Sequence, residues 1–464
     1  MKRSNFLKSI LGVSAFLGSP FSSIANGSIN EIEDLISSMS ETSSGSMLSY
    51  ADLPITKVKV GIIGLGNRGK VLLEMFDYLI ENGNAEITAV CDIQEKNRNF
   101  ALNHLKKKQK KKPMSFGKDE NSWEDLLLQD NIDLVLIATP WRWHTPMVLK
   151  AMESGKHVAC EVPISYTLED CWKIVQTAEG TKRHCIMIEN CCYNSEELWI
   201  MNMIQEGVFG ELTHAECAYN HDLRAHLLSQ DYYQDQWRVK HHVERNGNFY
   251  TTHGIGPIGF YMGIGRGDTF SRICSMSSQE ASLSSTAKRL GSQFTNIACG
   301  DVNTSLLQTA KGKSIMIQFD VHSGRPYSRI NQLIGTKAVH EGYPSRLFID
   351  SEEPIFWGHE WLNKDDYQTY RNKYEHPMVL KLRNISEGFK QGHGGMDFVM
   401  IYRLIKCLNK GLPLDINVYD SAMWSAITPL SELSVAKKSK SIEFPDFTGG
   451  KWKKERPLEV MRDI

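Results

Sequence analysis

The sequence carries almost no net charge and lacks the cysteine patterns of a metal site. Its 464 residues hold 53 Lys and Arg against 54 Asp and Glu, a formal charge of −1. Such a balance gives no charge-based argument for binding nucleic acid or a membrane surface. The ten cysteines form no CxxC pair and no paired Cys/His spacing, although Cys191 and Cys192 are adjacent. We therefore predict no metal site and no disulfide framework, with most thiols buried as small apolar side chains.

The N-terminal apolar run is too short to anchor the chain in a bilayer. Lys2 and Arg3 precede an apolar stretch centred on residues 10–17, and residues 23–25 form a small-x-small cleavage site. This pattern predicts an export signal over residues 1–25, and hence a periplasmic or extracellular protein. The second arginine of a twin-arginine signal is missing, so the export route stays open. The alternative is a disordered amphipathic tail on a cytosolic enzyme.

The length of the chain exceeds that of one compact core and predicts two domains with flanking segments. We expect a serine-rich linker over residues 26–55 and an α/β domain with a doubly wound parallel sheet over residues 56–188. A second domain is expected over residues 189–452, followed by a polar tail over residues 453–464.

A glycine-rich turn lies at the start of the first of these domains. The apolar strand 58–63 runs directly into Gly64, Gly66 and Gly69, which have G-x-G-x-x-G spacing, and helical periodicity follows over residues 70–80. Glycines at this spacing let the backbone turn tightly and let a pyrophosphate approach the free N–H groups of the helix. The sequence therefore predicts a dinucleotide site, although another α/β domain could carry a similar turn.

An acidic residue after the next strand indicates which dinucleotide binds. The apolar strand 86–90 leads to Asp92, 23 residues past Gly69. A carboxylate here can accept hydrogen bonds from the ribose hydroxyls and repels a 2′-phosphate, while the neighbouring Ile93 offers no positive charge. We therefore predict NAD rather than NADP as the cofactor.

Later strands of the same domain also end in polar or aromatic residues. The apolar strand 132–139 is followed by Pro-Trp-Arg-Trp-His at 140–144, the next strand delivers Glu-Val-Pro at 161–163, and strand 185–188 leads into Glu189 and Asn190. Ligands of open α/β sheets bind beyond the carboxyl ends of the strands. We expect these segments to border the cofactor.

The motifs resemble those of the Gfo/Idh/MocA oxidoreductase superfamily and, within it, most closely those of glycoside hydrolase family 109, the NAD-dependent α-N-acetylgalactosaminidases. The resemblance covers residues 58–452. It implies a second domain with an open, largely antiparallel sheet, a tightly bound NAD, and a glycan substrate with terminal N-acetylgalactosamine. Chains of this superfamily often pair across their sheets, so a homo-oligomer is a further expectation. The matching motifs lie at residues 140–144, 189–193, 219–224, 252–257, 325–327, 392–397 and 445–452.

The resemblance also implies an unusual hydrolytic route, because NAD-dependent glycosidases are exceptions to the two-carboxylate rule. The sugar is oxidised at C3, loses its C2 proton and its leaving group, adds water, and is reduced again, so NAD is regenerated. Sugar dehydrogenases of the superfamily usually have Glu-Lys-Pro where this chain has Glu161, Val162 and Pro163. Valine cannot move a proton, which favours the glycosidase. The alternatives are an NAD-dependent sugar oxidoreductase and a binding protein without turnover.

Matching the motifs residue by residue implies the members of the site. The catalytic candidates are His253, Tyr219 and Glu189, of which His253 is the strongest because imidazole exchanges protons near neutral pH. The implied substrate contacts are Tyr219, Arg238, Tyr250 and Tyr327; Tyr219 and Tyr250 could also be core aromatics, and Arg238 could form a structural salt bridge. His241, His242 and His393 are interpreted as structural, and no metal ligand is implied. The implied cofactor contacts are Gly64, Gly66, Asn67, Arg68, Gly69, Asp92, Trp141, Arg142, Trp143, His144, Glu161, Val162, Asn190, Tyr250, Thr251, Thr252 and His253.

Overall fold

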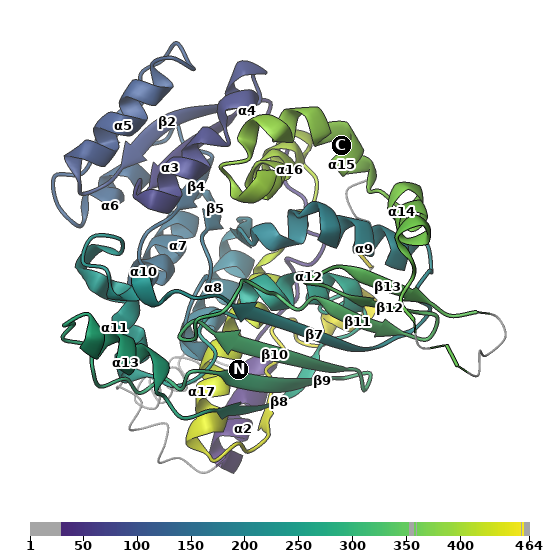
Figure 1. Cartoon of the computed structure of the whole chain (residues 1–464). Helices are drawn as coiled ribbons and strands as arrows, with labels where there is room; N and C mark the ends of the chain where they lie inside the picture. The colour runs from purple at the N-terminus through teal and green to yellow at the C-terminus, as the bar shows by residue number, and fades with distance from the viewer. Residues whose placement is uncertain (1–28, 352–356, 359, 456, 459–464) are drawn as a thin grey trace.

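The protein contains two β-sheets that share one continuous apolar core (Figure 1). The computed structural model describes residues 29–351, 357–358, 360–455 and 457–458. The export signal expected over residues 1–25 lies outside these ranges. Figure 1 shows the first sheet with its helices at the upper left and the second sheet below it.

The first sheet is parallel throughout, with strand order β3-β2-β1-β4-β5-β6. This is the order of a doubly wound dinucleotide-binding domain, in which helices cover both faces of the sheet. Burial on both faces explains the nearly unbroken apolar runs, since every residue of β4 and β5 is buried. The strands are β1 (Val58–Ile63), β2 (Ala85–Cys91), β3 (Met114–Phe116), β4 (Leu134–Ile137), β5 (His157–Cys160) and β6 (Cys185–Met187). Their helices are α3 (Asn67–Glu74), α4 (Asp77–Glu81), α5 (Glu95–Leu105), α6 (Ser122–Leu127), α7 (His144–Glu153) and α8 (Leu168–Thr181).

The second sheet has eight strands in the order β13-β12-β11-β7-β10-β9-β8-β14. Only β7 and β10 pair in parallel, and the other pairings are antiparallel. Buried and more exposed residues alternate along β9, as expected for a sheet with one covered face. The strands are β7 (Leu212–Asn220), β8 (Phe270–Ser277), β9 (Asn303–Thr309), β10 (Ser314–Asp320), β11 (Gln332–Gly335), β12 (Ala338–Glu341), β13 (Arg346–Ile349) and β14 (Ile442–Glu443).

Helices α12 (Thr252–Met262) and α17 (Val418–Ala436) pack on the covered face and connect the two sheets, α12 against β7 and α17 against both β8 and α8. The sequence-based prediction of an α/β fold with a parallel first sheet and a largely antiparallel second sheet is therefore confirmed. The remaining α-helices are α2 (Ile29–Ser40), α9 (Ser195–Gln205), α10 (Arg224–Leu228), α11 (Trp237–Glu244), α12 (Thr252–Met262), α13 (Ser282–Arg289), α14 (Lys364–Lys373), α15 (Pro377–Ser386), α16 (Met396–Lys410) and α17 (Val418–Ala436). Short 3₁₀ helices include η2 (Trp141–Trp143), η3 (Asn190–Tyr193), η4 (Gln234–Gln236), η5 (Glu387–Phe389), η6 (His393–Gly395) and η7 (Lys451–Lys454).

Glycines in α12 let this helix approach its neighbours closely. A Cβ atom at Gly254 would lie 3.0 Å from the backbone nitrogen of Ala218 in β7, and one at Gly256 would lie 2.9 Å from Cγ of Glu189. Larger residues would therefore push the helix away from both. This close packing brings His253, at the start of α12, beside β7 and beside Glu189.

The segment expected to be a linker, residues 26–55, is in fact docked on the fold from Ile29 onward. Helix α2 forms because Ile36 and Met39 lie on one face at i, i+3 spacing, and both pack against the core. Beyond the helix, Met47 is buried and its N–H donates to the Tyr419 hydroxyl at 3.1 Å. The abundance of serine misled the prediction, because several of these serines make hydrogen bonds within the fold.

Glu179 in α8 is the main polar anchor of the docked segment. Its carboxylate accepts hydrogen bonds from the Ser43 hydroxyl at 2.9 Å, from the Ser44 N–H at 3.1 Å and from the Gly45 N–H at 2.9 Å. The Tyr419 hydroxyl of α17 donates to the same carboxylate at 2.6 Å. One side chain thus joins α8, α17 and the segment that precedes the first domain.

We expect Glu179→Ala to lower the free energy of unfolding by about 2 kcal/mol, because hydrogen bonds to a charged acceptor are lost at several donors. Glu153→Ala is the matched control, since this exposed glutamate stands at the end of the neighbouring helix α7. Denaturant titration of both variants measures the difference. Equal stability of the two variants would contradict the role of Glu179 as an anchor.

Candidate active site

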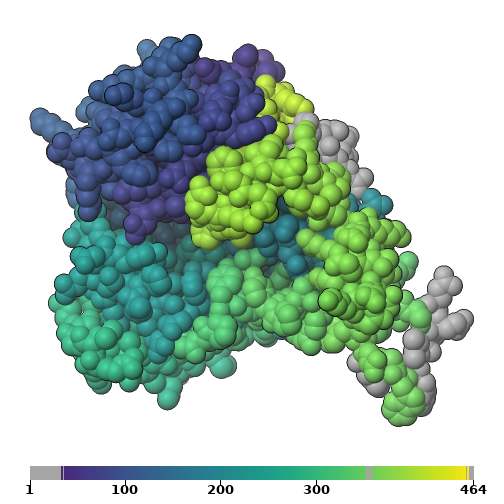
Figure 2. Space-filling model, turned by 45° about the horizontal axis from the view of Figure 1, so that its top comes forward, coloured from purple at the N-terminus to yellow at the C-terminus, as the bar shows by residue number. Residues whose placement is uncertain are grey.

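A cleft of about 910 Å³ lies between the carboxyl edge of the first sheet and the segment from β7 to α12. Figure 2 shows the furrow between the purple and blue part of the surface and the teal segment below it. The cleft gathers most of the residues that the sequence singled out. Those that line it are Gly64, Gly66, Asn67, Arg68, Asp92, Trp141, Arg142, Trp143, His144, Glu161, Val162, Asn190, Tyr219, Arg238, Tyr250 and His253.

The glycine turn between β1 and α3 has the shape that a pyrophosphate requires. Gly64 has φ of +88°, and a Cβ at Gly69 would lie 1.9 Å from the Gly64 carbonyl oxygen, so both positions need glycine. A Cβ at Gly66 would meet no atom of the described residues within 4 Å, which leaves space for a ligand in front of the helix. No side chain caps the N-terminus of α3, so its N–H groups can bind an anion. The residues present fit a dinucleotide.

Asp92 is held at the end of β2 by the turns around it. Its carboxylate accepts hydrogen bonds from the Leu65 N–H at 2.7 Å, from the Gln94 N–H at 2.7 Å and from the Asn97 amide at 3.2 Å. A carboxylate has about four lone-pair positions, so one remains for a ribose hydroxyl.

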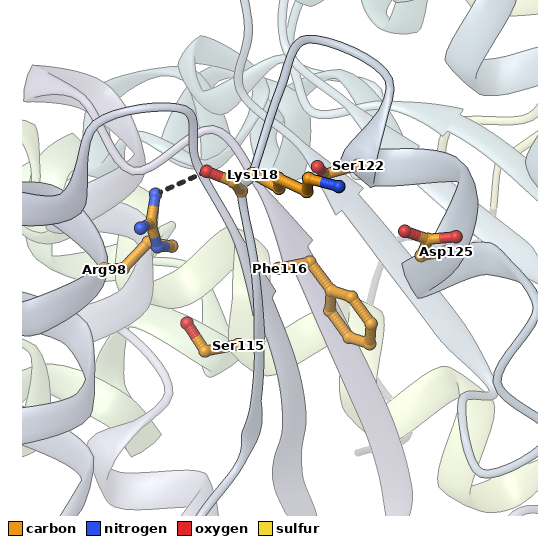
Figure 3. Close-up of a pocket in the computed structure, with 7 residues that line it drawn as sticks. Arg98, Ser115, Phe116, Lys118, Ser122 and Asp125 are labelled. Atoms are coloured by element: carbon orange, nitrogen blue, oxygen red, sulfur yellow. Dashed lines mark hydrogen bonds between the residues drawn. The ribbon is translucent and has the colours of Figure 1, made fainter.

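A smaller hollow of about 360 Å³ lies beside this turn and contains Arg98 (Figure 3). The guanidinium of Arg98 donates to the backbone carbonyl oxygens of Asp92 at 2.6 Å and of Gly117 at 3.0 Å. These bonds hold the guanidinium against the backbone of the turn. The hollow therefore supports Asp92 and offers no separate chemistry.

An ion-pair network fixes the glycine turn to the C-terminal half of the chain. Arg68 donates to Glu161 at 2.6 Å and to Asp397 at 2.8 Å, and the Asn190 amide donates to Asp397 at 2.7 Å. His393 lies 2.8 Å from the same carboxylate of Asp397. Burial would raise the pKa of Asp397, but Arg68 and His393 hold it below its ordinary value. The Asp397 carboxylate therefore stays ionised and connects α16 to the glycine turn.

The aromatic loop 140–144 forms 3₁₀ helix η2 and borders the cleft. The Trp141 indole donates to the Val162 carbonyl at 3.2 Å. His144 has a ring nitrogen 2.7 Å from the Pro163 carbonyl oxygen and the other 2.8 Å from that of Thr139. Burial lowers the pKa of His144, while the two carbonyl oxygens oppose this shift, and both contacts fix the ring at the end of the loop.

Four residues that the resemblance marks for the sugar lie against one another on the opposite wall. The ring of Tyr219 lies 4.5 Å from that of Tyr250 and 5.4 Å from that of His253, measured between centroids. The guanidinium carbon of Arg238 lies 4.7 Å from the centre of the Tyr250 ring. Burial raises the pKa of Tyr219 to about 12, with Arg238 opposing this shift, so its hydroxyl stays protonated near neutral pH.

Arg238 is a buried cation without a carboxylate partner among the described residues. Its side chain donates to the Tyr233 hydroxyl at 2.8 Å and lies over the rings of Trp141 and Tyr250. Its Nε has no hydrogen-bond partner within the described part of the chain. An unsatisfied buried donor is costly, so its place in the cleft wall indicates that a ligand oxygen completes it.

Glu189 lies behind His253 rather than in the cleft. The carboxylate is fully buried, and His253 Nδ1 is 2.8 Å from one of its oxygens. Burial alone would raise the pKa of Glu189, but the His253 imidazole and the Cys191 N–H hold it below its ordinary value. An ionised carboxylate only accepts hydrogen bonds, so the proton of a neutral His253 ring resides on Nδ1 and leaves Nε2 unprotonated.

Other residues implied by the resemblance lie away from the lining. Gly69 is inside the turn, and Thr251 and Thr252 are buried, with the Thr251 hydroxyl donating to the Trp424 carbonyl at 2.7 Å. Tyr327 stands at the rim, its ring 6.1 Å from that of Tyr219.

The structure also adds residues to the cleft that the sequence reasoning missed. His221 lies within the motif 219–224 and could have been found there, whereas the others carry no motif. The added residues include His221, Tyr232, Tyr233 and Trp237. His241, which the sequence analysis interpreted as structural, also lines the cleft.

Comparison with known proteins defines the class of the protein. Residues 58–189 match the family model "Oxidoreductase family, NAD-binding Rossmann fold", and residues 193–454 match "Glycosyl hydrolase 109, C-terminal domain". A glycosyl hydrolase family 109 protein of Shewanella sp. (strain W3-18-1) is 44% identical over 410 residues, 87% of this chain and 88% of that protein. The chain is thus a glycosidase with an NAD-binding domain, and it belongs to glycosyl hydrolase family 109.

Two further proteins are similar to this chain, one in sequence and one in fold. A protein of Shewanella oneidensis named alpha-N-acetylgalactosaminidase is 42% identical, again over 87% of this chain and 88% of that protein. Levoglucosan dehydrogenase in complex with NADH superposes with a TM-score of 0.63 at 17% identity, covering 84% of this chain and 99% of that one. The similarity to levoglucosan dehydrogenase shows a shared fold alone. No helix in the described ranges is long and apolar enough to cross a membrane.

We expect Gly66→Ala to weaken NAD binding about tenfold or more, because the added methyl group would occupy the space that the pyrophosphate needs. The protein without NAD should keep its thermal stability, since this Cβ meets no protein atom. Gly180→Ala, a helical glycine whose Cβ is equally free, is the control. Unfolding midpoints with and without NAD measure the effect, and wild-type stabilisation by NAD in Gly66→Ala would contradict the assignment.

Proposed function

We propose that the protein removes terminal α-linked N-acetylgalactosamine from glycans and regenerates its NAD in each turnover. Membership of family 109 supports the glycosidase class, and the Shewanella oneidensis relative supports the sugar. The observation that carries the proposal is the pair of Glu189 and His253 at the wall of a dinucleotide cleft, together with Val162 where a dehydrogenase would carry lysine.

The cofactor, when bound, supplies reversible acceptance of a hydride from the sugar. The glycine turn and the N-terminus of α3 would hold its pyrophosphate, and Asp92 would hold its ribose. The contacts of Arg68 with Glu161 and Asp397 keep this turn in place. Asn67 donates to the Tyr232 carbonyl at 3.2 Å, and this contact closes the turn against the opposite wall.

His253 is placed to take and return the proton at C2 of the sugar. Because Glu189 accepts the Nδ1 proton, Nε2 carries a lone pair that can act as a general base. Tyr219 is less suited to that task, since burial raises its pKa to about 12. Its protonated hydroxyl is suited to donate a hydrogen bond to an oxygen of the substrate.

Arg238 is placed to bind a neutral oxygen of the substrate. Its guanidinium has no carboxylate partner in the described ranges and lies among three aromatic rings. The acetamide carbonyl of N-acetylgalactosamine is an acceptor of the required kind. Recognition of the acetamide by Arg238 therefore explains why an acetylated sugar would be preferred over galactose.

Val162 favours hydrolysis over net oxidation. Its buried side chain lines the cleft and offers no proton donor or acceptor. A sugar oxidoreductase needs a group that takes the hydroxyl proton when the hydride leaves. Oxidation with release of a keto sugar is the second candidate function, and the match of residues 58–189 to the oxidoreductase family model supports it.

Release of 4-nitrophenol from 4-nitrophenyl α-N-acetylgalactosaminide tests the proposal. We expect many turnovers per bound NAD without an added oxidant and without accumulation of NADH. The 4-nitrophenyl α-galactoside is the matched substrate without the acetamide and should react more slowly. Accumulation of NADH and a keto sugar, without release of nitrophenol, would instead establish the oxidoreductase.

Substitution of His253 and substitution of Glu189 should lower kcat to different extents. We expect His253→Ala to lower kcat about 100- to 10,000-fold, the range of general acid–base catalysis. Glu189→Gln should lower kcat less, because an amide oxygen can still accept the Nδ1 proton but stabilises a protonated ring poorly. Both proteins should retain NAD. His214→Ala, on the half-buried part of β7, is the control, and near-full activity of His253→Ala would refute its role as base.

A further inference from the structure

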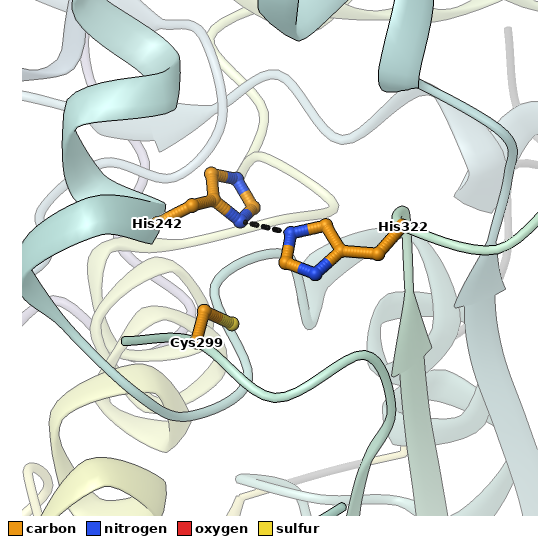
Figure 4. Close-up of side chains that lie close together, drawn as sticks. All are labelled: His242, Cys299 and His322. Carbon is orange, nitrogen blue, oxygen red and sulfur yellow. Dashed lines mark hydrogen bonds between the residues drawn. The ribbon is translucent and has the colours of Figure 1, made fainter. Parts of the chain in front are cut away.

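Three buried side chains from distant parts of the chain meet outside the cleft (Figure 4). His242 lies in the last turn of α11, Cys299 in the segment between α13 and β9, and His322 just beyond β10. None is more than 1% exposed. Figure 4 shows the facing nitrogens of the two imidazoles, with the sulfur of Cys299 beside them.

The distances in this cluster are close to those of a tetrahedral zinc site. His242 Nδ1 and His322 Nε2 are joined by a hydrogen bond of 2.9 Å, which an ion would replace, and ligand atoms of the three residues all lie within 4.8 Å of one another. Zinc bonds of about 2.0–2.3 Å at tetrahedral angles place two ligand atoms roughly 3.3–3.7 Å apart. Small shifts of the imidazoles and of Cys299 would therefore accommodate an ion. The Gly247 carbonyl, 4.0 Å from Cys299 Sγ, lies within reach of the fourth position.

A carboxylate stands behind one of the imidazoles, as it does in many metal sites. Asp301 Oδ1 lies 3.5 Å from His322 Nδ1 and also accepts the Ser282 N–H at 3.1 Å, which fixes its position. A carboxylate at this position can accept a proton from Nδ1 of His322, which would leave the Nε2 lone pair for an ion. One thiolate and one carboxylate would balance the two charges of a divalent ion in this buried place.

We propose that His242, Cys299 and His322 bind one divalent metal ion of the zinc type, with Asp301 orienting His322. The ion has a structural role, because it joins α11, the 294–300 segment and the end of β10. The N–H groups of Ala298 and Cys299 already donate to the His242 carbonyl, at 3.1 and 3.0 Å. Arg238 lies one helical turn before His242, so a fixed α11 also fixes the guanidinium in the cleft wall.

Metal analysis of the purified protein tests the proposal. Protein produced with added zinc and then dialysed should retain about one ion per chain in the wild type, and Cys299→Ser should lose it. Cys191→Ser is the matched control, because Cys191 belongs to the other His, Cys and carboxylate cluster in the described ranges, with Glu189 and His253. This control should keep its zinc.

Cobalt substitution gives a second measurement that does not depend on a variant folding well. Co²⁺ bound in the wild type should show a near-ultraviolet thiolate-to-cobalt absorption, which zinc removes. Equal zinc content in the wild type and in Cys299→Ser would overturn the assignment. Wild-type protein with neither retained zinc nor the cobalt absorption would do so as well.

Discussion

The contact of His253 with the buried carboxylate of Glu189 is the constraint on which the site depends. An ionised group without solvent is stable only when hydrogen bonds compensate its burial, and here His253 and the Cys191 N–H do so. The contact requires α12 to approach the end of β6 within van der Waals distance, which the glycine at 256 permits. The fold thus fixes the imidazole tautomer, and this tautomer leaves the lone pair on Nε2.

The second constraint joins the two halves of the cleft. Arg68 belongs to the glycine turn, yet its guanidinium contacts Asp397 in α16, far along the chain. Asn67 and Gln94 reach the opposite wall at Tyr232 and Gln234. A dinucleotide in this cleft would lie under these contacts, which suits a cofactor that stays bound through the reaction.

Patterns that act locally were predictable from the sequence, and packing between distant segments was not. Strand β1, the glycine turn and Asp92 are recognised from residues close to them in the sequence. Spacing and periodicity were therefore enough to predict the parallel sheet. Most of the cleft residues were predicted through family motifs, whereas Tyr232, Tyr233 and Trp237 belong to no motif and were missed. The docking of residues 29–55 depends on Glu179, and the cluster of His242, Cys299 and His322 depends on three separate segments. Neither leaves a spacing signal. Thr251 is the opposite case, because it was predicted as a cofactor contact by motif matching, but its side chain does not line the cleft.

Exchange of hydrogen at C2 of the sugar reports directly on proton removal by His253. In the proposed reaction, His253 removes the C2 proton, and a proton is returned to C2 in each turnover. Hydrolysis of the α-N-acetylgalactosaminide in deuterated water should therefore release N-acetylgalactosamine with deuterium at C2, as nuclear magnetic resonance of the product would show. Product that carries only protium at C2, at full rates of hydrolysis, would contradict the account and indicate direct displacement at C1.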